Sequence, residues 1–222
     1  PTTTTSTTSA PLAPNPFCID AGGRPGSRTD ESTVNGDFDG DGTQDLFAVY
    51  RLGSSWFLWA RLSGGGAGSY RLVTEINLPW SFQYWDGTTP ENLRVVDANS
   101  LGGPRDVATV RLYAGLGSYY GLFSTQDCEL LPFVKEDGTI PSLYSAMGAN
   151  HSDFPECDPV DRVVRQVVVS CAGAVDTCPT LDLTAEEWEA TFDPLRFTVG
   201  AAYARTINQT EYGELVANSC IG

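Results

Sequence analysis

Short runs of apolar and polar residues, separated by glycine-containing turns, dominate residues 35–125. These runs are rich in β-branched and aromatic side chains and predict β-strands joined in hairpins. Further along the chain, Val163–Ser170 is the most apolar run and predicts a buried strand. We therefore expect an all-β protein. The predicted strands are Leu46–Arg51, Trp56–Leu62, Tyr70–Leu78, Leu93–Asp97, Val107–Tyr113, Tyr119–Ser124, Val163–Ser170 and Leu195–Arg205.

One segment, residues 184–192, predicts a short helix. Thr184 and Glu187 have the spacing of a capping box, and Trp188 and Phe192 lie one helical turn apart, where both could face the core. Residues 17–34 and 126–160 contain repeated Gly and Pro and predict irregular structure.

Acidic residues alternate with glycine and other residues in Asp37-Phe-Asp-Gly-Asp-Gly-Thr-Gln-Asp45. The glycines allow the backbone to curl, so that carboxylate oxygens converge with a backbone carbonyl. Several hard oxygen ligands on one tight loop favour Ca²⁺ over other common ions, whereas the simpler alternative is a solvated acidic turn. The predicted calcium ligands are Asp37, Asp39, Asp41, Thr43 and Asp45.

This loop is not an EF-hand, because Ala48 occupies the twelfth position, where an EF-hand has a bidentate Glu. A predicted strand follows it, and Tyr50-Arg-Leu and Gly53-Ser-Ser-Trp-Phe57 then form a hairpin pattern. Residues 35–62 resemble the calcium loop and hairpin of the FG-GAP/VCBS repeat family, which builds β-propeller blades in integrin α chains and secreted bacterial proteins. The resemblance extends to about residue 125 and implies bound Ca²⁺ and a secreted protein involved in adhesion.

The pattern of acidic loop, strand, turn and aromatic strand occurs again about 60 residues later. In this second copy only Asp97, Asn99 and Asp106 remain as plausible ligands, so we expect a degenerate loop without a metal. A weaker third copy begins near Asp153–Asp161. We expect one domain over residues 17–222, with repeat 1 at about 35–94, repeat 2 at about 95–150 and a C-terminal segment at about 151–222. Closed propellers use four or more blades, so two or three propeller-like antiparallel repeats predict an open or sandwich-like arrangement.

The chain of 222 residues carries 28 acidic and 13 basic residues, a net charge of −15. Nucleic acids and anionic membranes require cationic surfaces, so we expect neither as a partner. No apolar run is long enough to span a membrane. Six cysteines without a Cys-x-x-Cys pair, and with a single histidine, favour disulfides over zinc. Of fifteen possible connectivities we expect the local pair Cys171–Cys178 and a pair Cys18–Cys220 that joins the chain ends, with Cys128 and Cys157 completing the candidates.

Residues 1–16 are rich in Thr, Ser and Pro and predict an extended arm. Because Thr has high β propensity, the arm could add as a strand to its own sheet or to a second copy, and head-to-tail donation between copies would form a filament. The chain begins at Pro1, and we expect a secretion leader to have been removed. Candidate glycosylation sites are Thr2, Thr3, Thr4, Thr5, Ser6, Thr7, Thr8 and Ser9 in the arm, and Asn150 and Asn208 in acceptor triplets.

Catalytic motifs are missing from the sequence. The single histidine, His151, lies in a polar turn typical of a surface residue, and no nucleophile elbow or phosphate loop is present. A two-carboxylate glycoside hydrolase stays open, although no feature selects a pair. Trp80, Tyr84 and Trp85 lie in a predicted loop, where exposed aromatic rings could contact carbohydrate.

Two functions compete on these grounds. The first is a non-enzymatic, extracellular, calcium-binding subunit of a surface fibre, with copies of itself as partner. The second is a secreted adhesion module that binds glycans through Trp80, Tyr84 and Trp85.

Overall fold

The computed structural model describes residues 20–63, 70–76, 93–99, 101–114, 117–217 and 219–220. These residues form an all-β fold with one short helix, α2 (Gln209–Ala217), as the sequence predicts for the fold class. The predicted arm at residues 1–16 and Trp80, Tyr84 and Trp85 lie outside the described residues.

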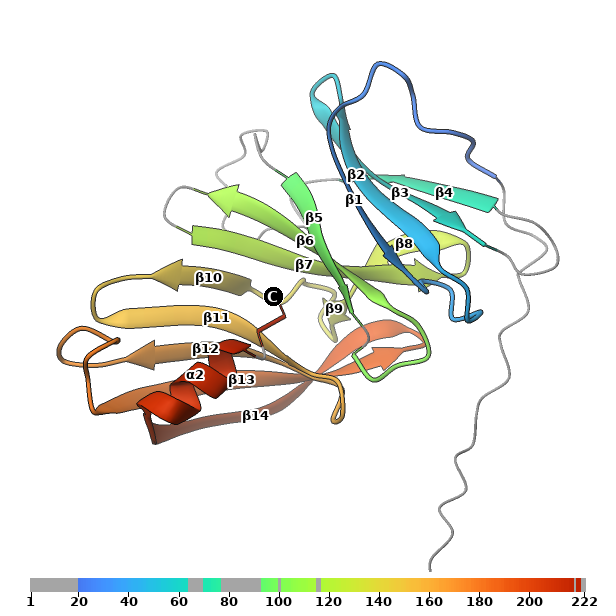
Figure 1. The fold of residues 1–222 in the computed structure, drawn as a ribbon. Coiled ribbons are helices and arrows are strands. Elements are labelled where there is room, and N and C mark those ends of the chain that lie inside the picture. The colour runs from blue at the N-terminus through green and yellow to red at the C-terminus, as the bar shows by residue number, and fades with distance from the viewer. Residues whose placement is uncertain are drawn as a thin grey trace, which may run out of the picture.

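The first sheet is an antiparallel meander in which β1, β2, β3 and β4 are neighbours in chain order (Figure 1). Residues 20–28 cover part of the face that does not face the second sheet, where Ala48, Tyr50 and Trp59 are buried. There Arg24 lies over the ring of Trp59, and the indole Nε1 of Trp59 donates to the carbonyl of Gly22. The strands are β1 (Thr29–Gly36), β2 (Asp45–Leu52), β3 (Ser55–Leu62) and β4 (Tyr70–Glu75).

The second sheet has ten strands and begins with a similar meander, β5-β6-β7, to which β8 pairs. Strand β7 is shared, since its last residues pair with β8 and its first residues pair with β10. From β10 the sheet continues through β11, β12, β13 and β14 to β9. The strands are β5 (Leu93–Asn99), β6 (Val107–Ala114), β7 (Gly117–Gln126), β8 (Glu129–Pro132), β9 (Val134–Lys135), β10 (Leu143–Met147), β11 (His151–Asp158), β12 (Val163–Ser170), β13 (Thr180–Phe192) and β14 (Leu195–Asn208).

The largest core lies where the first sheet packs on β5–β8. Phe38, Phe47, Trp56, Leu93 and Phe123 are all fully buried in it. Burial of this apolar surface contributes about 25 cal/mol per Å². The two meanders therefore form a sandwich-like unit, consistent with the arrangement that the sequence predicts.

The helix expected at residues 184–192 is wrong. These residues lie in β13, where buried Leu181, Leu183 and Ala185 alternate with exposed neighbours. A bulge between Glu186 and Trp188 shifts the alternation by one, so that Trp188 and Phe192 remain buried. Trp188 and Phe192 are four residues apart, a spacing that places two side chains on the same face of a strand as well as of a helix, so it could not distinguish the two.

The helix lies instead at α2, where the side chain of Asn208 accepts a hydrogen bond from the N–H of Glu211 and caps the first turn. Asn is a favoured N-cap residue, but the sequence patterns above identify Asn208 only as a glycosylation candidate. Tyr212 and Leu215 pack α2 onto the core formed by β11–β14.

Two regions expected to be irregular contain strands. β1 begins at Thr29, inside residues 17–34, and β8–β11 occupy much of residues 126–160. Pro155 lies within β11, at a place where the strand borders the C-terminal segment rather than β10 and where its carbonyl accepts from the N–H of Cys220. A strand tolerates proline on an edge that offers no partner to its missing N–H.

Two disulfides join described residues. Cys171–Cys178 forms as the sequence predicts. The predicted pair Cys18–Cys220 is wrong, because Cys220 bonds to Cys157 and fixes the C-terminal segment to β11. Cys128 is also disulfide-bonded. Within the described part of the chain, no helix is long and apolar enough to cross a membrane.

Candidate metal centre

The acidic loop between β1 and β2 curls around its own carboxylates. Gly40 and Gly42 have φ of 78° and 84°, in the left-handed region that favours glycine. The carboxylate of Asp37 accepts hydrogen bonds from the N–H groups of both glycines, at 2.9 Å each. Asp39 and Asp41 each accept from the N–H two residues later. The hydrogen bonds that curl the loop therefore join residues no more than five positions apart.

Three of the predicted ligands converge. Asp37, Asp39 and Asp45 each offer one carboxylate oxygen, and these oxygens lie within 4.8 Å of one another. An ion with oxygen ligands at about 2.3–2.6 Å could contact all three. Among the described residues, no Lys, Arg or His forms an ion pair with any of the three.

Asp45 is the most buried member of the cluster, with 2% of its surface exposed. Its two oxygens accept hydrogen bonds from the N–H groups of Phe38 and Ser63, at 2.8 and 2.7 Å. Burial, reinforced by the charge of Asp39, raises the pKa of Asp45 to about 7. Burial and then the charge of Asp41 raise the pKa of Asp39. A bound cation would compensate these carboxylates.

Asp41 and Thr43 are placed differently from these three. Asp41 accepts a hydrogen bond from the hydroxyl of Ser63 at 2.8 Å and another from the N–H of Thr43, which is exposed. Ser63 therefore supports both Asp41 and Asp45 from the end of β3. Nothing in the sequence pattern identified Ser63, because it lies 18 residues beyond Asp45 and is adjacent only through strand pairing.

The second loop, between β5 and β6, holds the first in place. The N–H of Asp37 donates to the side chain of Asp106 at 2.9 Å, and the N–H of Asp106 donates to the carbonyl of Asp37 at 2.7 Å. A Cβ on Gly40 would lie 2.5 Å from the carbonyl oxygen of Pro104. Thr125 of β7 also donates to the carbonyl of Phe38. The acidic loop thus lies at the junction of the two sheets.

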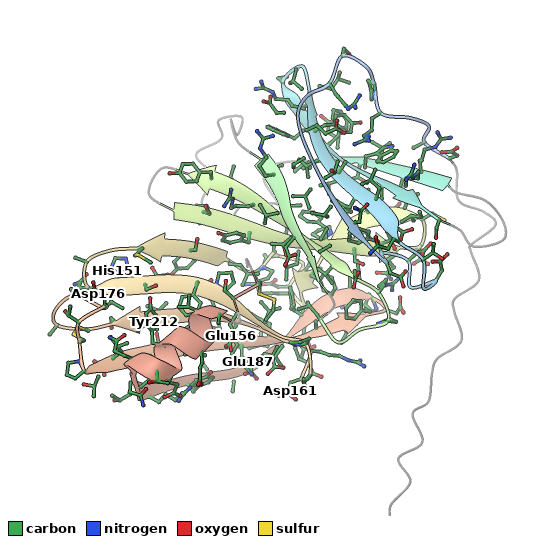
Figure 2. All side chains as sticks on the ribbon, in the orientation of Figure 1. His151, Glu156, Asp161, Asp176, Glu187 and Tyr212 are labelled. Atoms are coloured by element: carbon green, nitrogen blue, oxygen red, sulfur yellow. A yellow bond between two sulfur atoms is a disulfide. The ribbon has the colours of Figure 1, made fainter. Side chains whose placement is uncertain are left out.

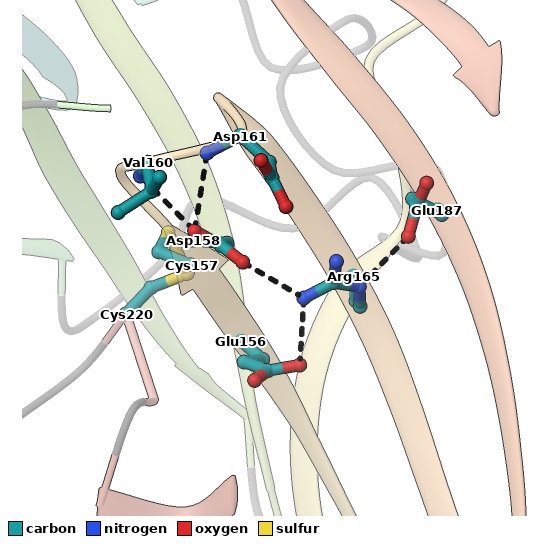
Figure 3. Close-up of polar contacts among 8 residues, drawn as sticks. All are labelled: Glu156, Cys157, Asp158, Val160, Asp161, Arg165, Glu187 and Cys220. Carbon is teal, nitrogen blue, oxygen red and sulfur yellow. Dashed lines mark hydrogen bonds and ion pairs between the residues drawn. A yellow bond between two sulfur atoms is a disulfide. The ribbon is translucent and has the colours of Figure 1, made fainter. Parts of the chain in front are cut away.

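The third acidic segment, at the turn between β11 and β12, gathers carboxylates around a side chain of the protein (Figure 3). Arg165 contacts Glu187 at 2.8 Å, Glu156 at 3.3 Å and Asp158 at 3.7 Å. Asp158 also accepts from the N–H groups of Val160 and Asp161. Arg165 therefore supplies the positive charge opposite Glu156 and Asp158 of this segment.

The remaining predicted sites are distributed over the surface. Asn150 and Asn208 are exposed. Asn208 caps α2 through its Oδ1, and its side-chain amide nitrogen takes no part in that hydrogen bond. His151 lies at the surface end of β11, 3.7 Å from Asp153, and is labelled in Figure 2. The candidates Thr2–Ser9 lie outside the described residues.

No protein-family model, curated protein or solved structure matches this chain. The resemblance of residues 35–125 to FG-GAP/VCBS repeats therefore stays a prediction.

Proposed function

We propose that this chain is a non-enzymatic structural protein that works outside the cell and is stabilised by Ca²⁺ bound in the loop between β1 and β2. The observation that carries the proposal is the convergence of Asp37, Asp39 and Asp45 without a basic partner among the described residues. Hard oxygen donors of this number suit Ca²⁺. Asp41 and the carbonyl of Thr43 are further candidate ligands.

The proposed role of the ion is mechanical rather than catalytic. Asp37 and Phe38 are hydrogen-bonded to Asp106 and Thr125 of the second sheet, and Asp45 begins β2. An ion that joins Asp37 to Asp45 would fix the loop that connects β1 to β2 against the second sheet. Disulfide bonds and millimolar calcium both belong to extracellular conditions, which supports the proposed location.

We further propose that copies assemble by strand addition, with the arm at residues 1–16 as donor. Among the described residues, β14 pairs with β13 along most of its length but with β9 only at Arg196 and Phe197. The open edge at residues 198–206 has no proline and one charged residue, Arg205. Unprotected strand edges of this kind accept other strands.

Direct calcium binding tests the metal site. The chelator-treated full chain is titrated with Ca²⁺ and with Mg²⁺ by calorimetry, and Asp39→Asn is compared with Asp161→Asn, an exposed acid of the third segment. We expect one calcium site in the native chain and in Asp161→Asn, and at least tenfold weaker binding in Asp39→Asn. Equal calcium affinity in all three proteins would remove loop 37–45 as the site.

Assembly is tested separately, by electron microscopy of the full chain and of a chain without residues 1–14, both in calcium. Filaments from the full chain only would support arm donation. Filaments from both would exclude the arm as donor, and dispersed monomers from both would exclude assembly.

A further inference from the structure

Helix α2 covers only part of the sheet face on which it packs. Beside it lies a cavity of about 460 Å³, bounded by α2 and by strands β6, β7, β10 and β11. Tyr212, labelled in Figure 2, faces it from the helix. None of the candidate calcium ligands lines this cavity.

Small hydroxyl side chains line the cavity on the strands. Ser118 of β7 pairs with Ser145 of β10, and Ser152 of β11 pairs with Met147 of β10. Ser118 is 6% exposed and Ser152 4% exposed. Neither hydroxyl has a hydrogen-bond partner among the described residues, and neither is sealed from solvent. Each hydroxyl can donate and accept a hydrogen bond, so the cavity offers a ligand two polar groups that no described residue uses.

The cavity rim is apolar and exposed. Tyr113, Met147 and Val216 are 55%, 79% and 44% exposed. They make up half of the six large apolar side chains that are exposed in the described part of the chain, the others being Val73, Val160 and Val199. Such a concentration around one cavity is typical of a binding site.

The charge of the lining restricts the ligand. Asp153 is the only Asp, Glu, Lys, Arg or His residue among the described residues that line the cavity. Together with the net charge of −15, this disfavours phosphate, sulfate and carboxylate ligands. A neutral ligand with its own hydroxyl groups suits the two serines.

We propose that this cavity binds a neutral sugar residue, with its hydroxyl groups on Ser118 and Ser152 and an apolar face of its ring against the exposed ring of Tyr113. Sugar hydroxyls both donate and accept hydrogen bonds, and the C–H face of a pyranose packs on aromatic rings. This site is distinct from the proposed calcium centre and from Trp80, Tyr84 and Trp85, and it stands or falls independently of them.

The test is a titration of the ¹⁵N-labelled, disulfide-intact full chain with the methyl glycosides of glucose, galactose, mannose and N-acetylglucosamine, followed by NMR. We expect at least one glycoside to shift the amide resonances of Ser118 and Ser152. Tyr113→Ala and Ser152→Ala should each weaken that binding about tenfold. Val199→Ala, an equally exposed apolar residue on β14, should leave it unchanged.

Cyclohexanol, which has an apolar ring but one hydroxyl, serves as the matched ligand control, and thermal unfolding verifies that each variant is folded. Tyr113 is exposed, so its variant provides a test even if Ser152→Ala does not fold. The proposal is overturned if no glycoside binds, if cyclohexanol binds as tightly, or if binding survives Tyr113→Ala.

Discussion

Beside the turn between β11 and β12, Arg165 lies among Glu156, Asp158 and Glu187. In the loop between β1 and β2, the carboxylates of Asp37, Asp39 and Asp45 converge, and no basic side chain of the described residues forms an ion pair with them. Both regions contain a buried acid with a raised pKa, Glu156 in one and Asp45 in the other.

The difference between the two regions lies in the source of the compensating charge. Burial raises the pKa of Glu156, but the charge and hydrogen bond of Arg165 oppose that effect. At Asp45 the opposing groups are backbone N–H groups, and the charge of Asp39 adds to the effect of burial. Acidic segments with similar sequence patterns can therefore be completed by an arginine or, as we propose, by a metal ion.

The largest expected effect is the loss of the arginine. Arg165→Ala leaves Glu156 buried without its partner and should lower the free energy of unfolding by about 3 kcal/mol. Urea unfolding measures it, with Arg196→Ala on the exposed side of β14 as control. If both variants are equally stable, the network around Arg165 does not compensate Glu156, and the contrast between the two regions fails.

Calcium removal should have the next largest effect. At a calcium concentration one hundred times the dissociation constant, binding stabilises the folded state by about 2.7 kcal/mol, which chelator would remove. The stabilisation by calcium, measured by thermal unfolding in calcium and in chelator, should be as large for Arg165→Ala as for the native chain and smaller by at least about 1.3 kcal/mol for Asp39→Asn. An undiminished calcium effect in Asp39→Asn would contradict the proposed centre.

Two glycine variants separate the packing of the acidic loop on the loop between β5 and β6 from the backbone curvature of the acidic loop itself. Gly40→Ala places a Cβ against the carbonyl of Pro104 at a left-handed φ and should cost about 2 kcal/mol. Gly42→Ala has the same backbone strain but open space around it, and should cost about 1 kcal/mol. Equal losses of stability in urea unfolding would mean that the second loop yields and does not hold the first.

The smallest expected effect is the pH dependence of the metal-free protein. The pKa of Asp45 is about 7 in the folded state and 3.8 as its ordinary value, so the folded state binds this proton more tightly. Its stabilising contribution is complete below pH 3.8 and is lost as the pH rises to about 7. Partial opening of the loop would reduce this contribution to the free energy of unfolding to about 1 kcal/mol.

Comparison of Asp45→Asn with the native chain in chelator, between pH 5 and 8, isolates this contribution. The native chain should lose stability relative to the variant as the pH rises. A constant difference between them would indicate that Asp45 does not carry a raised pKa.

Local patterns in the sequence determined the all-β class, the acidic loop and the pair Cys171–Cys178. In each case the interacting residues are neighbours in the chain: Gly40 and Gly42 donate to Asp37 a few residues away, and the two cysteines are separated by one turn. Alternation of apolar residues suffices for strands because it has the period of the strand itself.

Tertiary structure decided which of two capping signals became a helix. The segment that begins at Thr184 carries such a signal, but it pairs with β12 and β14 and buries Trp188. Asn208 is the last residue of β14, and the residues that follow it pair with no strand and form α2. The same holds for Cys157–Cys220, for Ser63 and Asp106, and for the pairing of Arg165 with Glu187, since these contacts join residues 18 or more positions apart. Their roles depend on strand order and register, and no short-range pattern encodes these because the packing of the whole core selects them.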